Sequence, residues 1–305
     1  MKQRVLVITG PTACGKSDLA LALAQQLDGE IISVDSLAVY RGFDIGSAKP
    51  TVEQQATVPH HLLNIRDPLQ PFTAADFRQA ATAAIADITR RGKRPILAGG
   101  TGLYLRTLLC GLTDAPGEDP QLRQTLRLRA EQEGTPVLLQ ELRAVDPVTA
   151  DRLHPNNLIR IIRALEVVRV TGVPLSQLQT AHGFSERPFE SLQFCLERPR
   201  EQLYRAIEQR VDTMLAAGLL AEVQQLLASG VPVDCKPMQA IGYKEVAAHL
   251  HGNLELEQMT ALIKRNTRRF AKRQLTWFKA EPELQWVAYP ENSATILKTA
   301  ALFFR

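Results

Sequence analysis

The sequence GPTACGKS, which runs from Gly10 to Ser17, fits the pattern G-x-x-x-x-G-K-[ST] of a phosphate-binding loop. It follows the apolar run RVLVIT (4–9) directly and precedes KSDLALALAQQL (16–27), in which leucine and alanine recur at helical spacing. In this strand–loop–helix context, backbone N–H groups surround phosphate oxygens at the N-terminus of the helix. A glycine turn with an incidental lysine is the weaker interpretation.

The motif also predicts how the phosphate is held. Lys16 supplies a positive charge, and the hydroxyl of Ser17 is a ligand for Mg²⁺. The predicted loop comprises Gly10, Pro11, Thr12, Ala13, Cys14, Gly15, Lys16 and Ser17.

Further apolar runs predict the fold class. Residues 30–34 (EIISV) and 94–100 (RPILAGG) have the composition of buried strands. Between them lies a predicted helix with Thr73 as N-cap and Asp76 three residues later. Strands that alternate with helices indicate an α/β fold with a mostly parallel sheet, here a P-loop NTPase-like core.

The pattern changes after Gly111. Residues 112–120 (LTDAPGEDP) are rich in turn formers, and the periodicity from 121 to about 180 is helical. Strands are expected again at 192–196 and within LQWVAY (284–289). We therefore predict an α/β core formed by residues 1–111 and 189–305, interrupted by an all-helical insertion domain at 112–188.

Composition narrows the class of protein. The 305 residues are 45% apolar and 22% charged, with a net charge of +4, which is typical of a globular protein. No apolar run approaches the ~18 residues of a membrane span, and the first apolar stretch is too short for a signal peptide. The cysteines lack the paired spacing of a disulfide framework or zinc finger. A cytoplasmic protein with no membrane partner is expected.

Two polar residues follow predicted strands at the edge where open α/β sheets bind ligands. Asp35 ends the second strand and is suited to hold Mg²⁺ or to accept a proton from a nucleophile, or else to cap a helix. Thr101 follows the third strand and either reaches the same ligand or caps the next helix. The adjacent histidines His60 and His61 point apart in an extended segment and are interpreted as structural.

Basic residues gather near the C-terminal end. Seven Lys or Arg and no Asp or Glu lie between Thr260 and Ala280. Two rows with a spacing of four share one helix face and indicate either a polyanionic partner or a solvated surface. The rows are Lys264, Arg268 and Lys272, and Arg265, Arg269 and Arg273.

Eight segments occur in an order that resembles the bacterial tRNA dimethylallyltransferases over essentially the whole chain. They are GPTACGKS, DSLAVYRGFDIGSAKP, VPHHLLN, FTAADF, GGTGLYLRTLLCGL, HPNNLIRIIRALEV, AIGYKE and KRQLTWFK. The resemblance implies transfer of a dimethylallyl group from dimethylallyl diphosphate to N6 of the adenosine 3′ of the anticodon (position 37), with release of diphosphate. It further implies a Mg²⁺-dependent monomer whose loop holds the prenyl diphosphate, with ATP binding left open.

The same resemblance assigns roles to residues. Asp35 would be the catalytic base, Thr101 would align the reacting groups, and Arg210 would bind the diphosphate unless it is a surface arginine. The anticodon stem-loop would be contacted by Asp35, Ser36, Leu37, Ala38, Thr101, Arg123, Ile159, Arg160, Ile161, Ile162, Arg163, Ala240, Ile241, Gly242, Tyr243, Lys244, Glu245, Lys272, Arg273, Gln274, Leu275, Thr276, Trp277, Phe278 and Lys279.

Several positions depart from the usual pattern of that family. Cys14 stands where serine is typical, Ala38 replaces a glutamine, and Asn157 and Ile159 stand where aspartate and glutamine are common. Two rival functions remain: a small-molecule or nucleotide kinase, which would turn over ATP, and an RNA-binding NTPase switch, which would bind RNA without modifying it.

Overall fold

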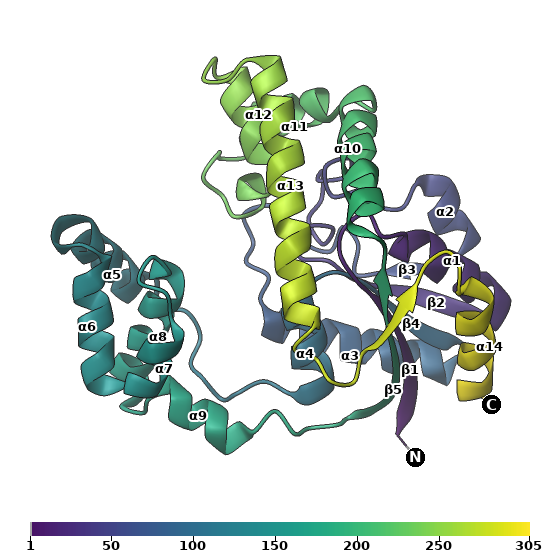
Figure 1. The fold of residues 1–305 in the computed structure, drawn as a ribbon, viewed down its shortest axis with the longest axis horizontal. Helices are drawn as coiled ribbons and strands as arrows, with labels where there is room; N and C mark the ends of the chain where they lie inside the picture. Colours follow the sequence, from purple (N-terminus) through teal and green to yellow (C-terminus); the bar gives the residue numbers. More distant parts are fainter. Residues whose placement is uncertain (1) are drawn as a thin grey trace. The chain divides into compact units, whose positions relative to one another are not determined.

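A parallel sheet is the centre of the α/β part of the chain (Figure 1). The computed structural model describes residues 2–305, so that Met1, the first residue of the expected core, lies outside the described residues. Within 2–305 the sheet has six strands in the order β3-β2-β4-β1-β5-β6, and every pair is parallel. The strands are β1 (Gln3–Thr9), β2 (Gly29–Val34), β3 (His60–His61), β4 (Arg94–Gly99), β5 (Phe189–Glu197) and β6 (Gln285–Ala288). The predicted α/β class is confirmed.

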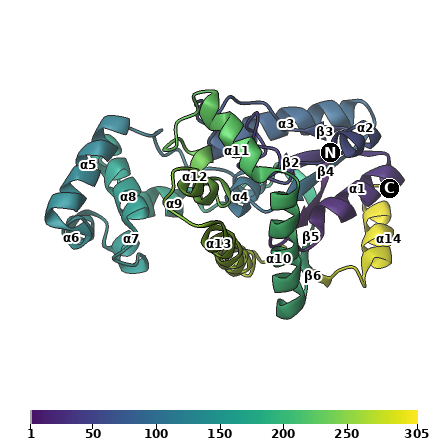
Figure 2. The same ribbon diagram turned by 90° about the horizontal axis from the view of Figure 1, so that it is seen from above.

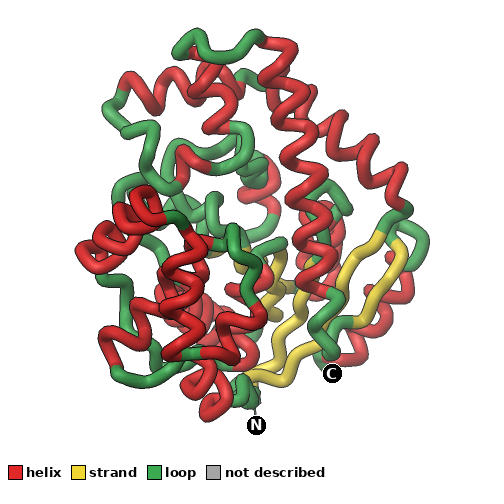
Figure 3. The backbone as a smooth tube through the Cα atoms, turned by 60° about the vertical axis from the view of Figure 1, so that its left-hand side comes forward, coloured by secondary structure: helices red, strands yellow, loops and turns green. Residues whose placement is uncertain are grey.

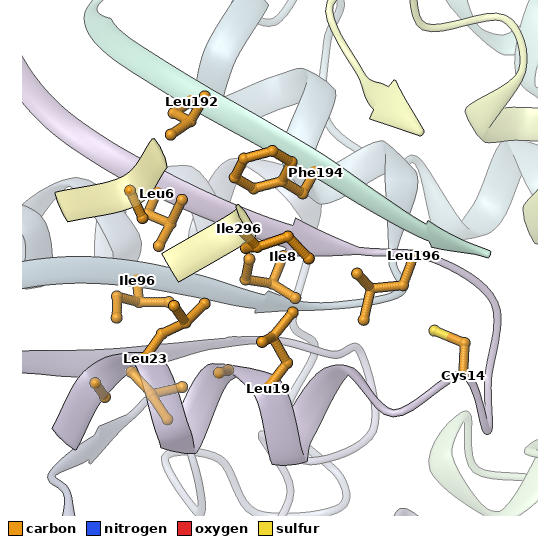
Figure 4. Close-up of a cluster of buried hydrophobic side chains, with 14 of the residues drawn as sticks. Leu6, Ile8, Cys14, Leu19, Leu23, Ile96, Leu192, Phe194, Leu196 and Ile296 are labelled. Atoms are coloured by element: carbon orange, nitrogen blue, oxygen red, sulfur yellow. The ribbon is translucent and has the colours of Figure 1, made fainter. Parts of the chain in front are cut away.

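Helices cover both faces of the sheet because its central strands are apolar on both sides. Helices α1 (Lys16–Leu27) and α14 (Ser293–Phe303) pack on one face, and α3 (Ala74–Arg90) packs on the other (Figure 2). Figure 4 shows Leu19 and Leu23 of α1 pointing toward Ile8 and Ile96 of the sheet. This packing fixes the start of α1, and with it the glycine loop, at the end of β1.

Four helices stand beyond the C-terminal ends of the strands. Helix α10 (Arg200–Ala216) follows β5 and runs beside α13 (Leu256–Phe278), as Figures 1 and 2 both show. Helices α11 (Leu219–Ala228) and α12 (Tyr243–Leu250) connect them, with a short 3₁₀ turn at Pro237–Gln239. The remaining helices of this part are α2 (Val52–Thr57) and α4 (Gly102–Cys110).

The chain divides into two compact units. One contains the residues up to Leu109 together with Pro188–Arg305, and the other is Cys110–Arg187. The second unit has its own apolar core, in which Leu126, Leu142 and Ile161 are fully buried. Its helices are α5 (Pro120–Glu133), α6 (Thr135–Val145), α7 (Pro147–Arg152), α8 (Leu158–Thr171) and α9 (Leu175–His182). Figure 3 distinguishes the strands of the sheet from these helical segments.

Local signals explain where several helices begin. The capping box predicted at the start of α3 forms, with Thr73 accepting from the N–H of Asp76 and the Asp76 side chain accepting from the N–H of Thr73. The expected returning strand is longer than predicted, and the short edge strand β3 and helices α2 and α14 were not predicted. Among the described residues no helix is both long enough and apolar enough to cross a membrane.

Candidate active site

The glycine loop between β1 and α1 adopts a backbone that its sequence requires. Gly10 and Gly15 have φ angles of 140° and 94°, and Ala13 also has a positive φ of 63°. A Cβ at Gly10 would lie 2.7 Å from the carbonyl oxygen of Leu196, so that β5 leaves no room for a side chain there. Cys14 is fully buried and lies near Leu196 (Figure 4). The glycine pattern is therefore a requirement of the fold as well as of the predicted phosphate site.

The Asp35 carboxylate caps a turn; the alternative expectation of a helix cap is wrong, because within residues 2–305 no helix begins between β2 and α2. Its Oδ1 accepts hydrogen bonds from the N–H groups of Leu37 (2.7 Å) and Ala38 (3.1 Å), which fixes the turn after β2. Within residues 2–305, Oδ2 accepts no hydrogen bond. One oxygen thus anchors the carboxylate, and the other is free to face a ligand.

Thr101 reaches the same edge of the sheet because β2 and β4 are neighbours. Its N–H donates to the carbonyl of Val34 at 3.2 Å, the residue that precedes Asp35. The loops after the two strands are therefore joined directly. Both side chains line one cavity.

Two cavities share a wall at this edge. The larger, about 380 Å³, lies among the loop after β2, α10, the start of α12 and α13, and the smaller, about 110 Å³, extends to Lys16 and Ser17 of the glycine loop. The smaller one also reaches Ser33 and Ala98, whose small side chains hollow the surface of the sheet. Seven residues line both cavities: Thr12, Asp35, Ser47, Gly100, Arg210, Phe270 and Gln274.

Arg210 places a cation at this shared wall. It projects from α10, and within residues 2–305 its guanidinium has no hydrogen bond and no ion pair. Burial lowers its pKa, whereas the charge of Asp35 acts in the opposite direction. A guanidinium remains charged in proteins, and a half-buried cation without a partner in the protein favours the approach of an anion. The geometry therefore favours an anionic ligand here over the surface role that was left open.

Gln274 connects helix α13 to the glycine loop. Its side-chain Oε1 accepts the N–H of Thr12 at 2.8 Å, and its Nε2 donates to the carbonyl of Gly100 at 2.9 Å. The residue is 7% exposed, so both ends of its amide are engaged in the interior. Gln274 was predicted to contact an RNA loop, but the structure gives it partners within the protein.

The loop after Tyr40 is held over both cavities by one carboxylate. Glu222 of α11 accepts hydrogen bonds from the backbone N–H groups of Asp44, Ile45 and Gly46 and from the hydroxyl of Tyr243. Three successive N–H groups that converge on one side chain form a concave anion site, filled here by the protein itself. Glu222 thereby fixes the position of the neighbouring cavity residues, which include Ser47.

The segment predicted at 240–245 divides into two groups. The cavity residues are Ala240, Ile241, Gly242 and Lys244. Tyr243 is instead fully buried against Phe43, with ring centroids 4.7 Å apart. Glu245 is 4% exposed and accepts hydrogen bonds from the N–H of Gly242 and the side-chain amide of Asn266. Only part of this segment is thus in a position to meet a ligand.

The cations of the two basic rows of α13 have two kinds of surroundings. Lys264 and Arg268 form ion pairs with Asp212 and Glu208 of α10, at 2.7 and 2.6 Å. Their charges thus stabilise the α10–α13 pair. Four other cations of the rows are exposed and have no ion pair within residues 2–305: Arg265, Arg269, Lys272 and Arg273.

The residues predicted at the C-terminal end of α13 lie partly at the surface and partly in the interior. Lys279 and Thr276 are exposed, Leu275 is half-buried and Phe278 is fully buried. Trp277 packs against Gly102 at the start of α4, where an added Cβ would lie 2.3 Å from the indole. The guanidinium of Arg106 lies 4.5 Å from the centroid of the Trp277 ring. The structure places Trp277 as a packing residue.

In the helical unit, Arg123 and Arg163 were predicted to contact tRNA, but they form hydrogen bonds within the unit. The Glu166 side chain is fully buried and accepts hydrogen bonds from Arg123 at 2.8 Å and from Arg163 at 2.5 Å. Arg163 also donates to the carbonyls of Pro116 and Gly117. Burial alone would raise the pKa of Glu166, but these hydrogen bonds lower it overall. The cluster fastens the start of the unit onto α8.

The other predicted residues of α8 lie on opposite sides of the helix. Ile161 and Ile162 are buried in the core of the unit. Ile159 is 80% exposed and Arg160 is also exposed. Only the last two present side chains at the surface for a partner.

The donors near the glycine loop suit Mg²⁺ without enclosing it. Ser17 and Asp35 supply a hydroxyl and a carboxylate to the smaller cavity. Among residues 2–305 no group of three or more His, Cys, Asp or Glu side chains is arranged to hold a metal. Mg²⁺ prefers oxygen ligands, keeps several waters and commonly binds through substrate phosphates, which fits this donor set. Both adjacent histidines have partners within the protein, since His61 pairs with Glu30 and His60 with the carbonyl of Val58, but His60 also lines the smaller cavity.

On the cavity-facing side of α13, sequence reasoning identified Gln274 but missed Ile263, Thr267 and Phe270. Ile263, Thr267, Phe270 and Gln274 follow one another at spacings of three or four, and all line the larger cavity. Two of these four residues are polar, so no apolar periodicity marks this side of the helix in the sequence. The contribution of Ser47 was also missed, because it lies on a loop without regular spacing.

Known proteins match this chain over most or all of its length. Residues 38–281 match the family model described as IPP transferase. The chain is 71% identical over 304 residues to tRNA dimethylallyltransferase 1 of Trichlorobacter lovleyi, with 100% of both chains covered. It is 52% identical over 303 residues to tRNA dimethylallyltransferase of Geobacter metallireducens, covering 99% of this chain and 98% of the other.

Solved structures give the same result. The tRNA isopentenylpyrophosphate transferase of Bacillus halodurans is 39% identical, with a TM-score of 0.74 and coverage of 99% of this chain and 97% of that one. A eukaryotic dimethylallyltransferase acting on tRNA is 30% identical, with a TM-score of 0.79 and coverage of 98% and 78%.

Proposed function

The chain belongs to the IPP transferase family and is a transferase that modifies tRNA, and on this premise we propose how its cavities divide the reaction. The dimethylallyl group moves from dimethylallyl diphosphate to N6 of the adenosine 3′ of the anticodon, at position 37. The position of Asp35 carries this proposal, because its carboxylate lies in the wall common to the larger cavity and the one that extends to Lys16 and Ser17. The prenyl donor occupies the smaller cavity, and the adenine enters the larger one.

The diphosphate is held by the glycine loop. The backbone amides of the loop and the N-terminus of α1 favour an anion. Lys16 donates to the carbonyl of Pro11 in this structure and turns toward the diphosphate when the donor binds. Arg210 approaches the diphosphate from α10. Mg²⁺ bound by the Ser17 hydroxyl and diphosphate oxygens would neutralise charge that develops on the leaving group. These residues recognise the diphosphate, and the loop motif is therefore compatible with a donor other than ATP.

Asp35 supports the acceptor side of the reaction. The N6–C1 bond forms, the bond from C1 to the diphosphate oxygen breaks, and the proton leaving N6 passes to Oδ2 of Asp35. The hydrogen bonds from Leu37 and Ala38 to Oδ1 hold the carboxylate in place for this transfer. Thr101 binds and aligns the reacting groups from the neighbouring loop.

The tRNA is bound mainly through its phosphates. The exposed cations of α13 are suited to the backbone of the anticodon loop, and the exposed Arg160 of α8 is suited to the stem. The target base leaves the stack to reach the larger cavity. We further propose that the active form is a monomer.

Mass spectrometry of an unmodified anticodon stem-loop tests the proposal. The RNA is incubated with the protein and Mg²⁺, with dimethylallyl diphosphate in one tube and ATP in another. We expect one C5 unit on the adenosine 3′ of the anticodon in the tube with the prenyl donor. Turnover of ATP without a modified adenosine would instead support a kinase or NTPase.

A further inference from the structure

Phe270 is an aromatic side chain that folding leaves uncovered. It lies on α13 and is 38% exposed, the most exposed of the ten phenylalanines, all of which fall within residues 2–305. The other large apolar residues on this side of the helix, Ile263 and Phe278, are 2% and 1% exposed. Burial of a phenylalanine ring is strongly favourable, so the exposed ring is not explained by the packing of α13.

The exposed ring lies in the wall that the two cavities share. Phe270 lines both of them, as do Asp35 and Arg210. It is separated by one helical turn from Gln274, whose side chain is fixed to the glycine loop. The position of the ring relative to the reacting groups is therefore set by a rigid helix rather than by a mobile loop.

The larger cavity also offers apolar surface from a second helix. Val211 and Met214 of α10 line it together with Phe270. At the same site Arg273 lies 5.6 Å from the centroid of the Phe270 ring and has no ion pair within residues 2–305. An aromatic ring beside an unpaired cation suits a ligand that has a flat apolar face and an attached phosphate.

We propose that Phe270 is the platform on which the extruded target adenine stacks when the base enters the larger cavity. The inference rests on the proposed function and adds to it the residue that holds the base by its face. A base taken out of its stack loses the contacts of its neighbours, and an aromatic side chain replaces them. Arg273 then accompanies the phosphate of the flipped nucleotide. Phe270 is a positioning residue, and Asp35 remains the group that receives the proton.

The test measures how much the target base contributes to binding, independently of turnover. Two anticodon stem-loops are compared, one with adenine at the target position and one with an abasic site, in the presence of Mg²⁺ and inorganic diphosphate. Each dissociation constant is measured by fluorescence anisotropy for the wild type and for Phe270→Ala, which gives a double-mutant cycle. Phe270→Tyr is the matched aromatic variant, and Phe270→Leu preserves apolar bulk should the alanine variant fold poorly.

Stacking on an aromatic ring changes affinity by roughly ten- to a hundredfold per base. We expect the wild type and Phe270→Tyr to prefer the adenine loop by a factor in that range. Phe270→Ala and Phe270→Leu should lose most of this preference while binding the abasic loop as the wild type does. Because Phe270 also lines the smaller cavity, the KM for dimethylallyl diphosphate is measured for all four proteins, and it should change less than the preference for the adenine loop.

Three results would overturn the inference. The first is equal binding of the adenine and abasic loops by the wild type, and the second is an unchanged preference for the adenine loop in Phe270→Ala. The third is a change in the KM for dimethylallyl diphosphate with no change in RNA binding, which would place the ring against the prenyl chain. The transfer assay distinguishes a failure of this inference from a failure of the proposed function. If the wild type transfers the C5 unit but the cycle shows no coupling, the function stands and the role of Phe270 does not.

Discussion

The side-chain Oε1 of Gln274 accepts the backbone N–H of Thr12 at 2.8 Å, so that helix α13 is fastened to the phosphate loop. The same amide donates to Gly100, which joins the loop after β4 to both. One glutamine therefore connects the helix that carries the exposed cations, the glycine loop and the loop that carries Thr101.

Substitution of Gln274 should impair catalysis more than RNA binding. Gln274→Met keeps the bulk but leaves the N–H of Thr12 and the carbonyl of Gly100 without partners, at a cost of about 0.5–1.5 kcal/mol for each half-buried group. We expect a lower free energy of unfolding in urea and a fall in kcat/KM for the donor of at least about tenfold. The dissociation constant of the stem-loop should change less than threefold.

Thr276→Val is the matched control for that experiment. It removes a side-chain hydrogen bond from the same helix, to the carbonyl of Lys272, but at an exposed position away from the loop. Its stability and kinetics should resemble the wild type. Equal behaviour of the two variants would show that Gln274 has no special part in positioning the loop.

Asp35→Asn should separate binding from proton transfer. The asparagine Oδ1 is able to keep the hydrogen bonds from Leu37 and Ala38, whereas the carboxylate that we propose as the proton acceptor is lost. Because general bases contribute about 10²- to 10⁴-fold, single-turnover transfer should slow by that order. Stem-loop affinity should stay near that of the wild type. A parallel loss of affinity would make Asp35 a binding residue instead.

The exposed cations of α13 should contribute to RNA affinity and the paired ones should not. Arg269→Gln removes an exposed charge, and we expect weaker stem-loop binding and a slope of log K against log salt that is smaller by roughly 0.7–1. Lys264→Gln is the control, because Lys264 is already paired with Asp212. Similar slopes for both variants would contradict the distinction between exposed cations that bind RNA and paired cations that do not.

Glu222→Gln should loosen the loop over the cavities. The neutral amide is a weaker acceptor than a carboxylate for the N–H groups of Asp44, Ile45 and Gly46. Hydrogen exchange of these amides should accelerate, and transfer should slow severalfold while the helices beneath remain protected. Tyr243→Phe removes a single donor to the same carboxylate and should have a smaller effect. Unchanged exchange in Glu222→Gln would show that other contacts hold the loop.

Acid should destabilise the sheet edge through Glu30. Hydrogen bonds from Arg91 lower the pKa of this carboxyl, with a further contribution from His61, although burial alone would raise it. A lowered pKa in the folded state means that the stabilisation is complete above the ordinary glutamate pKa of about 4.3 and is lost as pH falls through the lower folded value.

Urea unfolding at pH 7 and at progressively lower pH measures this effect. The free energy of unfolding of the wild type should fall below about pH 4. Glu30→Gln should be less stable at pH 7 by about 1–3 kcal/mol and should show a flatter dependence on pH. Glu190→Gln, at a half-exposed ion pair with Arg4, should follow the wild type. An unchanged slope in Glu30→Gln would assign the acid sensitivity to other carboxylates.

The sequence by itself determined the phosphate loop and the class of fold. The motif from Gly10 to Ser17 depends on local backbone conformation, and the alternating strands and helices depend on local periodicity, so both are visible in a short window of residues. The capping box at Thr73 is local in the same sense. The ordered segments of the family gave the reaction, since together they extend over the whole chain.

Only the tertiary structure decided which side chains face a ligand. Lys264 and Arg269 are alike in the sequence, but one meets a carboxylate of α10 and the other meets none within the described chain. Gln274 and Thr12 are 262 residues apart, and no local pattern indicates their hydrogen bond. Phe270 became a candidate through its exposure inside a cavity. Burial and partners arise from contacts between distant segments, whereas periodicity records only the face of an element on which a residue lies.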